Sequence, residues 1–153
     1  YLDKDPVKAA QMSCDKHVVK MILESAQMLS TAIRYLDPIN EHPVYKTAFL
    51  NHPCTVWCRK SQLNFKWLLM HMYYLAEIHS PHHKSASLLD YFFDFYWGFT
   101  WQQVEYTAFA NCTPYKTDAN TVSAYRKFMC NKWHNDVIRV TWNNGNKPEW
   151  YET

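Results

Sequence analysis

The apolar and polar residues in the first part of the chain alternate as they do in an amphipathic helix. Apolar side chains recur every three or four residues in one row, which consists of Val18, Ile22, Leu29, Ile33 and Leu36. Asp5 and Pro6 are residue types that start helices, and the pair Asp37-Pro38 is typical of a helix end. We therefore predict one long helix over residues 7–37.

A second stretch without proline, residues 54–80, has apolar side chains on nearly all sides of a helix. Trp57, Leu68 and Leu75 lie along one line of this helix, with polar residues between them. A helix that is apolar all round is usually central and buried. The stretch is therefore predicted to be a single buried helix.

The middle of the chain carries a weaker periodic signal. Residues 79–84 are polar and rich in histidine, which predicts a loop. Residues 85–96 are moderately helical, but they are so aromatic that a β-strand is also compatible with them. Residues 107–116 contain Pro114 and several loop-forming residue types, and we predict a loop there.

The last predicted helix covers residues 121–132, and Asp118 or Asn120 supplies its N-cap. The tail, residues 143–153, has no periodic pattern. Neither a repeat nor a change in composition marks a second domain. We predict one mainly α domain, residues 1–153, of about four helices.

Glycine is scarce in this chain and aromatic residues are abundant. Two glycines, Gly98 and Gly145, occur in 153 residues, and aromatic residues make up 17%. Phosphate-binding loops and dinucleotide fingerprints need several glycines within a few residues, and β-hairpins often need glycine at their turns. The composition therefore excludes an ordinary Rossmann or P-loop protein and argues against a β-sandwich or barrel.

The net charge and the cysteines bear on the partners and the cellular location of the protein. The formal net charge is +2, which permits a nucleic-acid partner without requiring one. The five cysteines are an odd number without tight pairing, a pattern typical of reduced thiols, so we predict an intracellular location. No uncharged apolar run is long enough to span a bilayer, and no membrane partner is expected.

A polar row crosses the otherwise apolar first helix. Its members are Cys14, His17, Lys20, Glu24 and Gln27. His17 and Glu24 are seven residues apart, which places them within about 20° of each other around the helix. The row is compatible with a solvated face that carries a Lys20–Glu24 ion pair. It is also compatible with a cleft in which Glu24, beside His17, acts as a general acid or base or stabilises a developing cation.

Further residues are candidates for binding a metal ion or DNA. Cys54 and Cys58, with His52 nearby, suggest zinc, but neither the histidines of residues 79–84 nor any other residues supply a convincing second pair, and no metal is predicted. Candidates for contact with phosphates or bases are Lys20, Arg59, Lys84, Arg126 and Trp150. The aromatic tail around Trp150 is expected either to pack back onto the domain or to stay exposed for a ligand, and we favour packing.

Several segments match one known pattern in the same order. Asp15-Lys16-His17 precedes Glu24, as an Asp-x-His precedes a catalytic glutamate seven residues on in that pattern. Residues 52–75 are similar to its second helix, residues 122–126 to a late helix with a DNA-contacting arginine, and residues 147–151 to a basic-Pro-x-Trp-Tyr tail. Together these segments resemble the phage pyrimidine-dimer DNA glycosylases of the endonuclease V type.

The resemblance implies a mainly helical enzyme that acts on DNA without a cofactor. In that family the N-terminal α-amine attacks C1′ of the damaged nucleotide and forms a Schiff base, while the glutamate stabilises the cation and moves protons. The resemblance assigns the first role to the amine of Tyr1 if the mature chain starts there, and to a residue outside the given sequence if it does not. It assigns the second role to Glu24, with His17 as its neighbour, and Arg126 and Lys84 are expected to contact phosphates. An ordinary α-amine is roughly one-tenth neutral at pH 7, far more than a lysine.

The chain departs from the family pattern at three positions. Leu23 and Gln27 stand where the family has arginines, and Tyr1 stands where it has a small hydroxyl residue. Lys20 is therefore an alternative amine, provided that burial lowers its pKa. Besides a glycosylase or abasic-site lyase, the sequence supports a non-catalytic phage module of the same fold that binds nucleic acid or a virion or host protein. A nucleotide hydrolase that uses His17 and Glu24 is a third, weaker hypothesis.

Overall fold

The structure, a computed structural model, describes residues 1–79 and 81–151, and within these residues it contains helices and no strand. The predicted mainly α class is confirmed, but six α-helices replace the four or so expected. They are α1 (Pro6–Gln11), α2 (Asp15–Leu36), α3 (Pro53–Lys60), α4 (Gln62–His79), α5 (Leu89–Gly98) and α6 (Thr121–His134), with a 3-10 helix, η1 (Lys84–Leu88), before α5.

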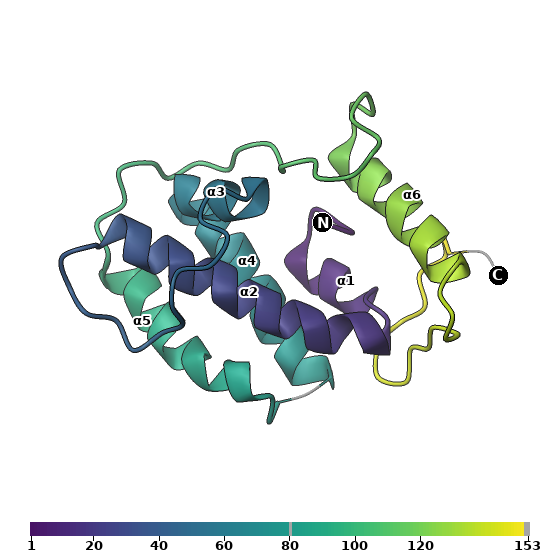
Figure 1. Ribbon diagram of the computed structural model, residues 1–153, viewed down its shortest axis with the longest axis horizontal. Helices are drawn as coiled ribbons and strands as arrows, with labels where there is room; N and C mark the ends of the chain where they lie inside the picture. Colours follow the sequence, from purple (N-terminus) through teal and green to yellow (C-terminus); the bar gives the residue numbers. More distant parts are fainter. Residues whose placement is uncertain (80, 152–153) are drawn as a thin grey trace.

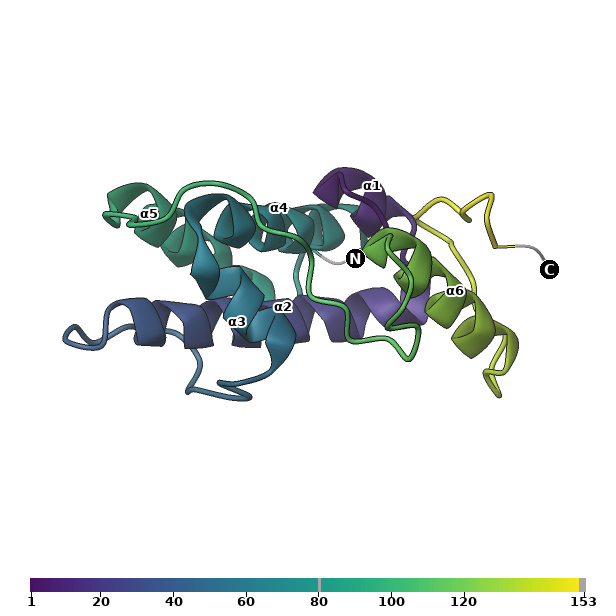
Figure 2. The same cartoon turned by 90° about the horizontal axis from the view of Figure 1, so that it is seen from above.

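The helices form two layers with α6 at one end (Figures 1 and 2). α2 runs along one side, and α1, α4 and α5 lie along the other. α4 packs against α1, α2 and α3, which agrees with its predicted central position. Its residues Phe65, Leu69, Met72 and Leu75 are fully buried. α6 lies at that end, close to the N-terminal segment in both views.

The prediction of one continuous helix over residues 7–37 is wrong, because the chain breaks between α1 and α2. The tail near the C-terminus supplies hydrogen bonds at the break. The N–H of Asp15 donates to the carbonyl of Thr141 at 2.9 Å, and the N–H of Asn146 donates to that of Gln11 at 2.8 Å. The Asp15 carboxylate also accepts from the N–H of Asn143. Contacts more than 120 residues away along the chain thus determine where α1 ends.

The predicted single helix over residues 54–80 is also interrupted. Ser61, between α3 and α4, has an extended backbone with φ −151° and ψ 161°. The next two N–H groups donate to a distant loop instead of to α3, since Gln62 donates to the carbonyl of Gln103 at 2.9 Å and Leu63 to that of Val104 at 3.0 Å. The break therefore turns α4 away from α3 while every one of these groups keeps a partner.

The other predicted elements agree more closely with the structure. The aromatic stretch 85–96 is helical, as η1 and α5, so its strand alternative is wrong. Residues 107–116 form a loop as predicted, and α6 is capped by Asn120, whose side chain accepts from the N–H of Ser123 at 3.2 Å. The predicted histidine-rich loop is shorter than residues 79–84, because α4 and η1 include its two ends, and residue 80 lies outside the described residues.

Side chains of α2, above all Arg34, hold a long loop between α2 and α3 in place. Arg34 donates hydrogen bonds to the carbonyls of His42, Val44 and Tyr45 at 2.8–3.1 Å. The loop returns along α2, where the N–H of Ala48 donates to the hydroxyl of Thr31 at 3.0 Å. No helix in the described part of the chain is long and apolar enough to cross a lipid bilayer.

Candidate functional site

A cavity of about 460 Å³ lies where α6 faces α2, α3 and α4. Four of the five members of the predicted polar row line it from α2, namely His17, Lys20, Glu24 and Gln27. Cys14, the fifth member, is buried as the N-cap residue of α2 and does not line it. The row therefore forms one wall of a pocket. Part of this wall is solvated, since the side chains of Lys20 and Glu24, paired at 3.5 Å, are 62% and 42% exposed.

The first residue of the chain lies in the same pocket. The ring of Tyr1 stacks on Phe109 with ring centres 4.3 Å apart and meets the edges of Trp57 and Tyr125 at 5.1 and 5.3 Å. Burial lowers the pKa of the Tyr1 α-amino group to about 6, although the nearby thiols of Cys54 and Cys112 oppose this shift. At pH 7 most of this amine is therefore neutral, which is the nucleophilic form.

Two imidazoles share the pocket with the amine. Burial, reinforced by the charges of Lys132 and the α-amino group, lowers the pKa of His17 to about 3. Burial lowers the pKa of His71 to about 4, although a hydrogen bond from Nδ1 to the carbonyl of Pro6 opposes this shift. Both rings are therefore neutral at pH 7. A neutral amine, two neutral imidazoles and the carboxyl group of Glu24 together can supply a nucleophile and proton acceptors at one place.

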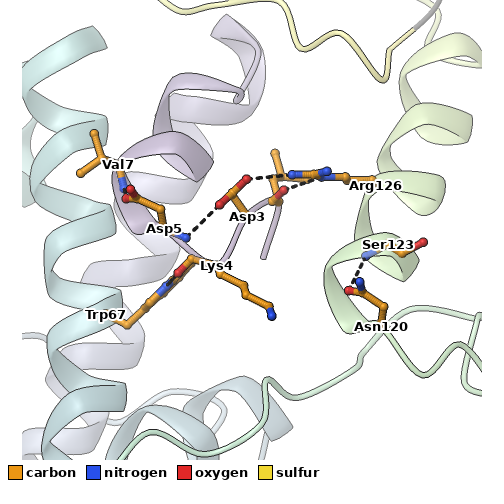
Figure 3. Close-up of polar contacts among 9 residues, drawn as sticks. Asp3, Lys4, Asp5, Val7, Trp67, Asn120, Ser123 and Arg126 are labelled. Carbon is orange, nitrogen blue, oxygen red and sulfur yellow. Dashed lines mark hydrogen bonds and ion pairs between the residues drawn. The ribbon is translucent and has the colours of Figure 1, made fainter.

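Arg126 anchors the N-terminal segment to α6 (Figure 3). Its Nε donates to the carbonyl of Leu2 at 2.8 Å, and its Nη2 pairs with the carboxylate of Asp3 at 2.8 Å. The indole N–H of Trp67 on α4 holds the next residue by donating to the carbonyl of Lys4 at 2.7 Å. Arg126 thus helps to place Tyr1 in the pocket, and its contact with DNA stays a prediction.

Apart from Lys20, which lines the pocket, the other residues predicted to contact DNA lie away from the pocket wall. Arg59 on α3 donates to the carbonyl of Leu50, and its guanidinium lies 4.1 Å from the ring centre of Tyr35. Lys84 is exposed at the start of η1. Trp150 stacks on Trp133 of α6 at 5.6 Å, and the following Tyr151 is 7% exposed, so the tail packs back onto the domain as favoured.

Some residues of the pocket were not predicted as site residues. One of them is His71, which is among the polar residues between Leu68 and Leu75 on the predicted second helix. A histidine on a helix that is otherwise apolar was the signal in the sequence that could have marked it as a site residue. Phe49 lies at the pocket on the α2–α3 loop, with its side chain 76% exposed and a left-handed backbone at φ 51°. Sequence alone carries no signal for that backbone conformation.

Of the residues considered for zinc, Cys54 and His52 lie close together in the structure, and Cys58 lies apart from them. Cys58 is fully buried in the core, where burial raises the pKa of its thiol well above the usual range. Cys54 instead lies near Cys112 of the loop 107–116 and near His52, and all three line the pocket. Within residues 1–79 and 81–151 no other cluster of potential metal ligands is found, and His79, His82 and His83 belong to none.

Comparisons with known proteins identified no relative of this chain. The chain gives no significant match to any family model, to any curated protein or to any solved structure.

Proposed function

We propose that this protein is a DNA glycosylase or abasic-site lyase that acts on damaged or modified bases through the α-amine of Tyr1 and Glu24. The observation that carries the proposal is that a buried amine and the glutamate of the polar row line one pocket. The same pairing defines the endonuclease V type glycosylases that the sequence resembles, and we propose that the helices adopt that fold. Such a protein acts on DNA inside a cell, and the resemblance is to phage enzymes.

The proposed reaction needs one amine and one proton acceptor. The amine attacks C1′ as the glycosidic bond breaks, and the base leaves with the bonding electron pair. The attacking nitrogen gives up a proton, and O4′ takes one when the sugar ring opens to the Schiff base. Glu24 is the group that moves these protons and faces the cationic intermediate. The two neutral imidazoles add no positive charge that would oppose that cation.

The walls of the pocket suit a nucleotide that has left the base stack. The volume lies within the range of small-molecule sites, and the partly exposed aromatic side chain of Phe128 offers a surface against which a base can stack. Phe49 lies at the pocket with most of its side chain in solvent. An exposed aromatic side chain at this position is suited to fill the gap that a displaced nucleotide leaves in the duplex.

The test is borohydride trapping on DNA with one abasic site, using a chain that starts at Tyr1. We expect a covalent adduct whose mass maps to the peptide that contains Tyr1. Glu24→Gln should lower the trapping rate by at least about 100-fold, as expected for loss of a general acid–base group. Glu41→Gln is the matched control, because Glu41 is an exposed carboxylate outside the pocket.

Two further variants identify the nucleophile. One additional residue before Tyr1 should abolish trapping, because it displaces the amine from its position. Lys20→Met should retain trapping. An adduct that maps to Lys20, or a chain that forms no adduct at any protein excess, would contradict the proposal.

A non-catalytic module on the same fold is the second candidate. Leu23 and Gln27 replace the arginines of the family, and Arg126 is already engaged by Leu2 and Asp3, so fewer cations remain for the phosphate backbone. The same experiment separates the two functions. Retention of intact DNA, or of a virion or host protein, without any adduct would favour the module.

A further inference from the structure

Three potential metal ligands from two distant segments meet at the pocket. His52 and Cys54 lie at the N-terminus of α3, and Cys112 lies on the loop 107–116. One ligand atom from each lies within 4.8 Å of the other two. The Sγ atoms of Cys54 and Cys112 are 3.6 Å apart. This cluster is outside the chemistry proposed for Glu24 and the amine.

The separation of the two sulfurs fits a shared metal ion. Zinc binds thiolates at about 2.3 Å in tetrahedral geometry, which places two sulfurs about 3.8 Å apart. A disulfide would need about 2.05 Å. The observed 3.6 Å is therefore close to the spacing of two ligands on one ion, and little backbone movement is needed to reach it.

Hydrogen bonds hold both segments in place before any ion binds. The hydroxyl of Tyr125 on α6 accepts from the N–H of Cys112 at 3.2 Å and donates to the carbonyl of Ala110 at 3.0 Å. The Nδ1 of His52 accepts from the N–H of Cys54 at 3.1 Å and so caps α3. Binding an ion through His52 costs this one hydrogen bond by either ring nitrogen, because Nδ1 then holds the ion or, when Nε2 holds it, carries the proton.

We propose that His52, Cys54 and Cys112 bind one Zn²⁺ ion, with its fourth position open to the pocket. Two thiolates and an imidazole favour zinc over harder ions such as Mg²⁺ or Ca²⁺. Three protein ligands with one open position are the arrangement found where zinc binds a water molecule or a substrate group. The ion would also join the loop 107–116 to α3. The inference does not depend on the proposed DNA chemistry.

The test is metal binding by the reduced, full-length chain after removal of bound metal with a chelator. Zinc is titrated in competition with a chromophoric chelator, and Co²⁺ is added separately as a spectroscopic probe. We expect one equivalent of zinc per chain. With Co²⁺ we expect a thiolate-to-metal charge-transfer band and the intense visible bands of four-coordinate cobalt.

Single substitutions identify the ligands. Cys112→Ser and His52→Ala should each weaken zinc binding by at least about 100-fold, since even changes to groups that only orient ligands cost 10–100-fold. Both side chains are exposed, so the fold should persist, and circular dichroism checks this. Cys130→Ser on α6 is the matched control, because Cys130 lies outside the cluster. It should leave both the affinity and the cobalt spectrum unchanged.

Three results would overturn the proposal. They are a reduced chain that competes for no zinc, a cobalt complex without a thiolate band, and a Cys112→Ser variant that binds as tightly as the parent. A purified chain that carries a Cys54–Cys112 disulfide is reduced before the titration, and the absence of zinc uptake after reduction then counts as the first of these results. Because every readout is metal binding, failure here is distinct from failure of the borohydride test.

Discussion

At the scale of single residues, Phe49 combines an exposed aromatic side chain with a backbone conformation that side chains disfavour. Its φ of 51° lies in the left-handed region, where a residue with a Cβ is destabilised by roughly 1–2 kcal/mol. Because the side chain is largely in solvent, its packing does not explain the conformation. Strain of this kind gathers at binding sites, which supports a role for Phe49 at the pocket.

Comparison of two variants isolates the strain at this position. Phe49→Gly should be more stable than Phe49→Ala by about 1 kcal/mol in urea unfolding, because glycine adopts a positive φ without steric conflict. At a residue with negative φ the order is reversed, since alanine restricts the unfolded chain more than glycine does. An alanine variant that is the more stable of the two would show that φ at residue 49 is negative in solution.

The residues of the site differ in how far they can be predicted. Glu24 and His17 stand out because their spacing places them on one side of one helix. Cys112 is 58 residues from Cys54 and meets it only through the fold. The sequence predicts no metal site because it shows no second pair of ligands near Cys54 and Cys58, and Cys112, the third ligand of the proposed zinc site, lies on a loop without any regular pattern.

At the scale of elements, the helix breaks were the features that the periodic pattern could not show. Neither break contains proline or glycine. Each break depends on hydrogen bonds to residues that are distant in the sequence. The N–H of Asp15 donates to the carbonyl of Thr141, and the N–H of Gln62 donates to the carbonyl of Gln103. The start of α6 was predictable because Asn120 caps it locally. Local signals were thus sufficient for the starts of α1 and α6, while tertiary contacts divide the long predicted helices.

The two glycines provide a test of the break between α1 and α2. A Cβ on Gly145 would lie 2.7 Å from the carbonyl oxygen of Gln11 and 3.0 Å from His79, whereas a Cβ on Gly98 would meet nothing within 4 Å. Gly145→Ala should therefore lower the free energy of unfolding by about 1–3 kcal/mol. Gly98→Ala, the control at the end of α5, should be neutral or stabilising by up to about 1 kcal/mol. Equal stability of the two variants would contradict the close approach of the tail to α1.

At the scale of the whole molecule, the pocket contains bases that folding keeps unprotonated. The pKa of His71 is about 4 in the fold and about 6.5 in an unfolded chain. The unfolded chain therefore binds more protons between these values, and the free energy of unfolding falls as the pH falls from about 6.5 to 4. His17 and the Tyr1 amine face His71, and their lowered pKa values act in the same direction.

The measurement is urea unfolding at a series of pH values. His71 alone should remove about 2 kcal/mol between pH 6.5 and pH 5, at 1.36 kcal/mol per pH unit. His71→Asn should make the profile shallower by this amount and leave the slope due to His17, while the asparagine amide can still donate to the carbonyl of Pro6. His82→Asn, at an exposed position, should leave the slope unchanged. A parent profile that is flat from pH 6.5 to pH 5 would show that His71 accepts protons in the folded state.

The contact of Arg126 with Leu2 and Asp3 joins segments that are more than 120 residues apart in the sequence. During translation the segment around Tyr1 leaves the ribosome before α6 does. Until α6 has been made, Arg126 cannot hold Tyr1 in the pocket. A nascent chain that has not reached α6 therefore carries Glu24 without the wall of the pocket that α6 supplies. For the proposed reaction, this order of assembly means that the pocket is finished only when α6 is in place.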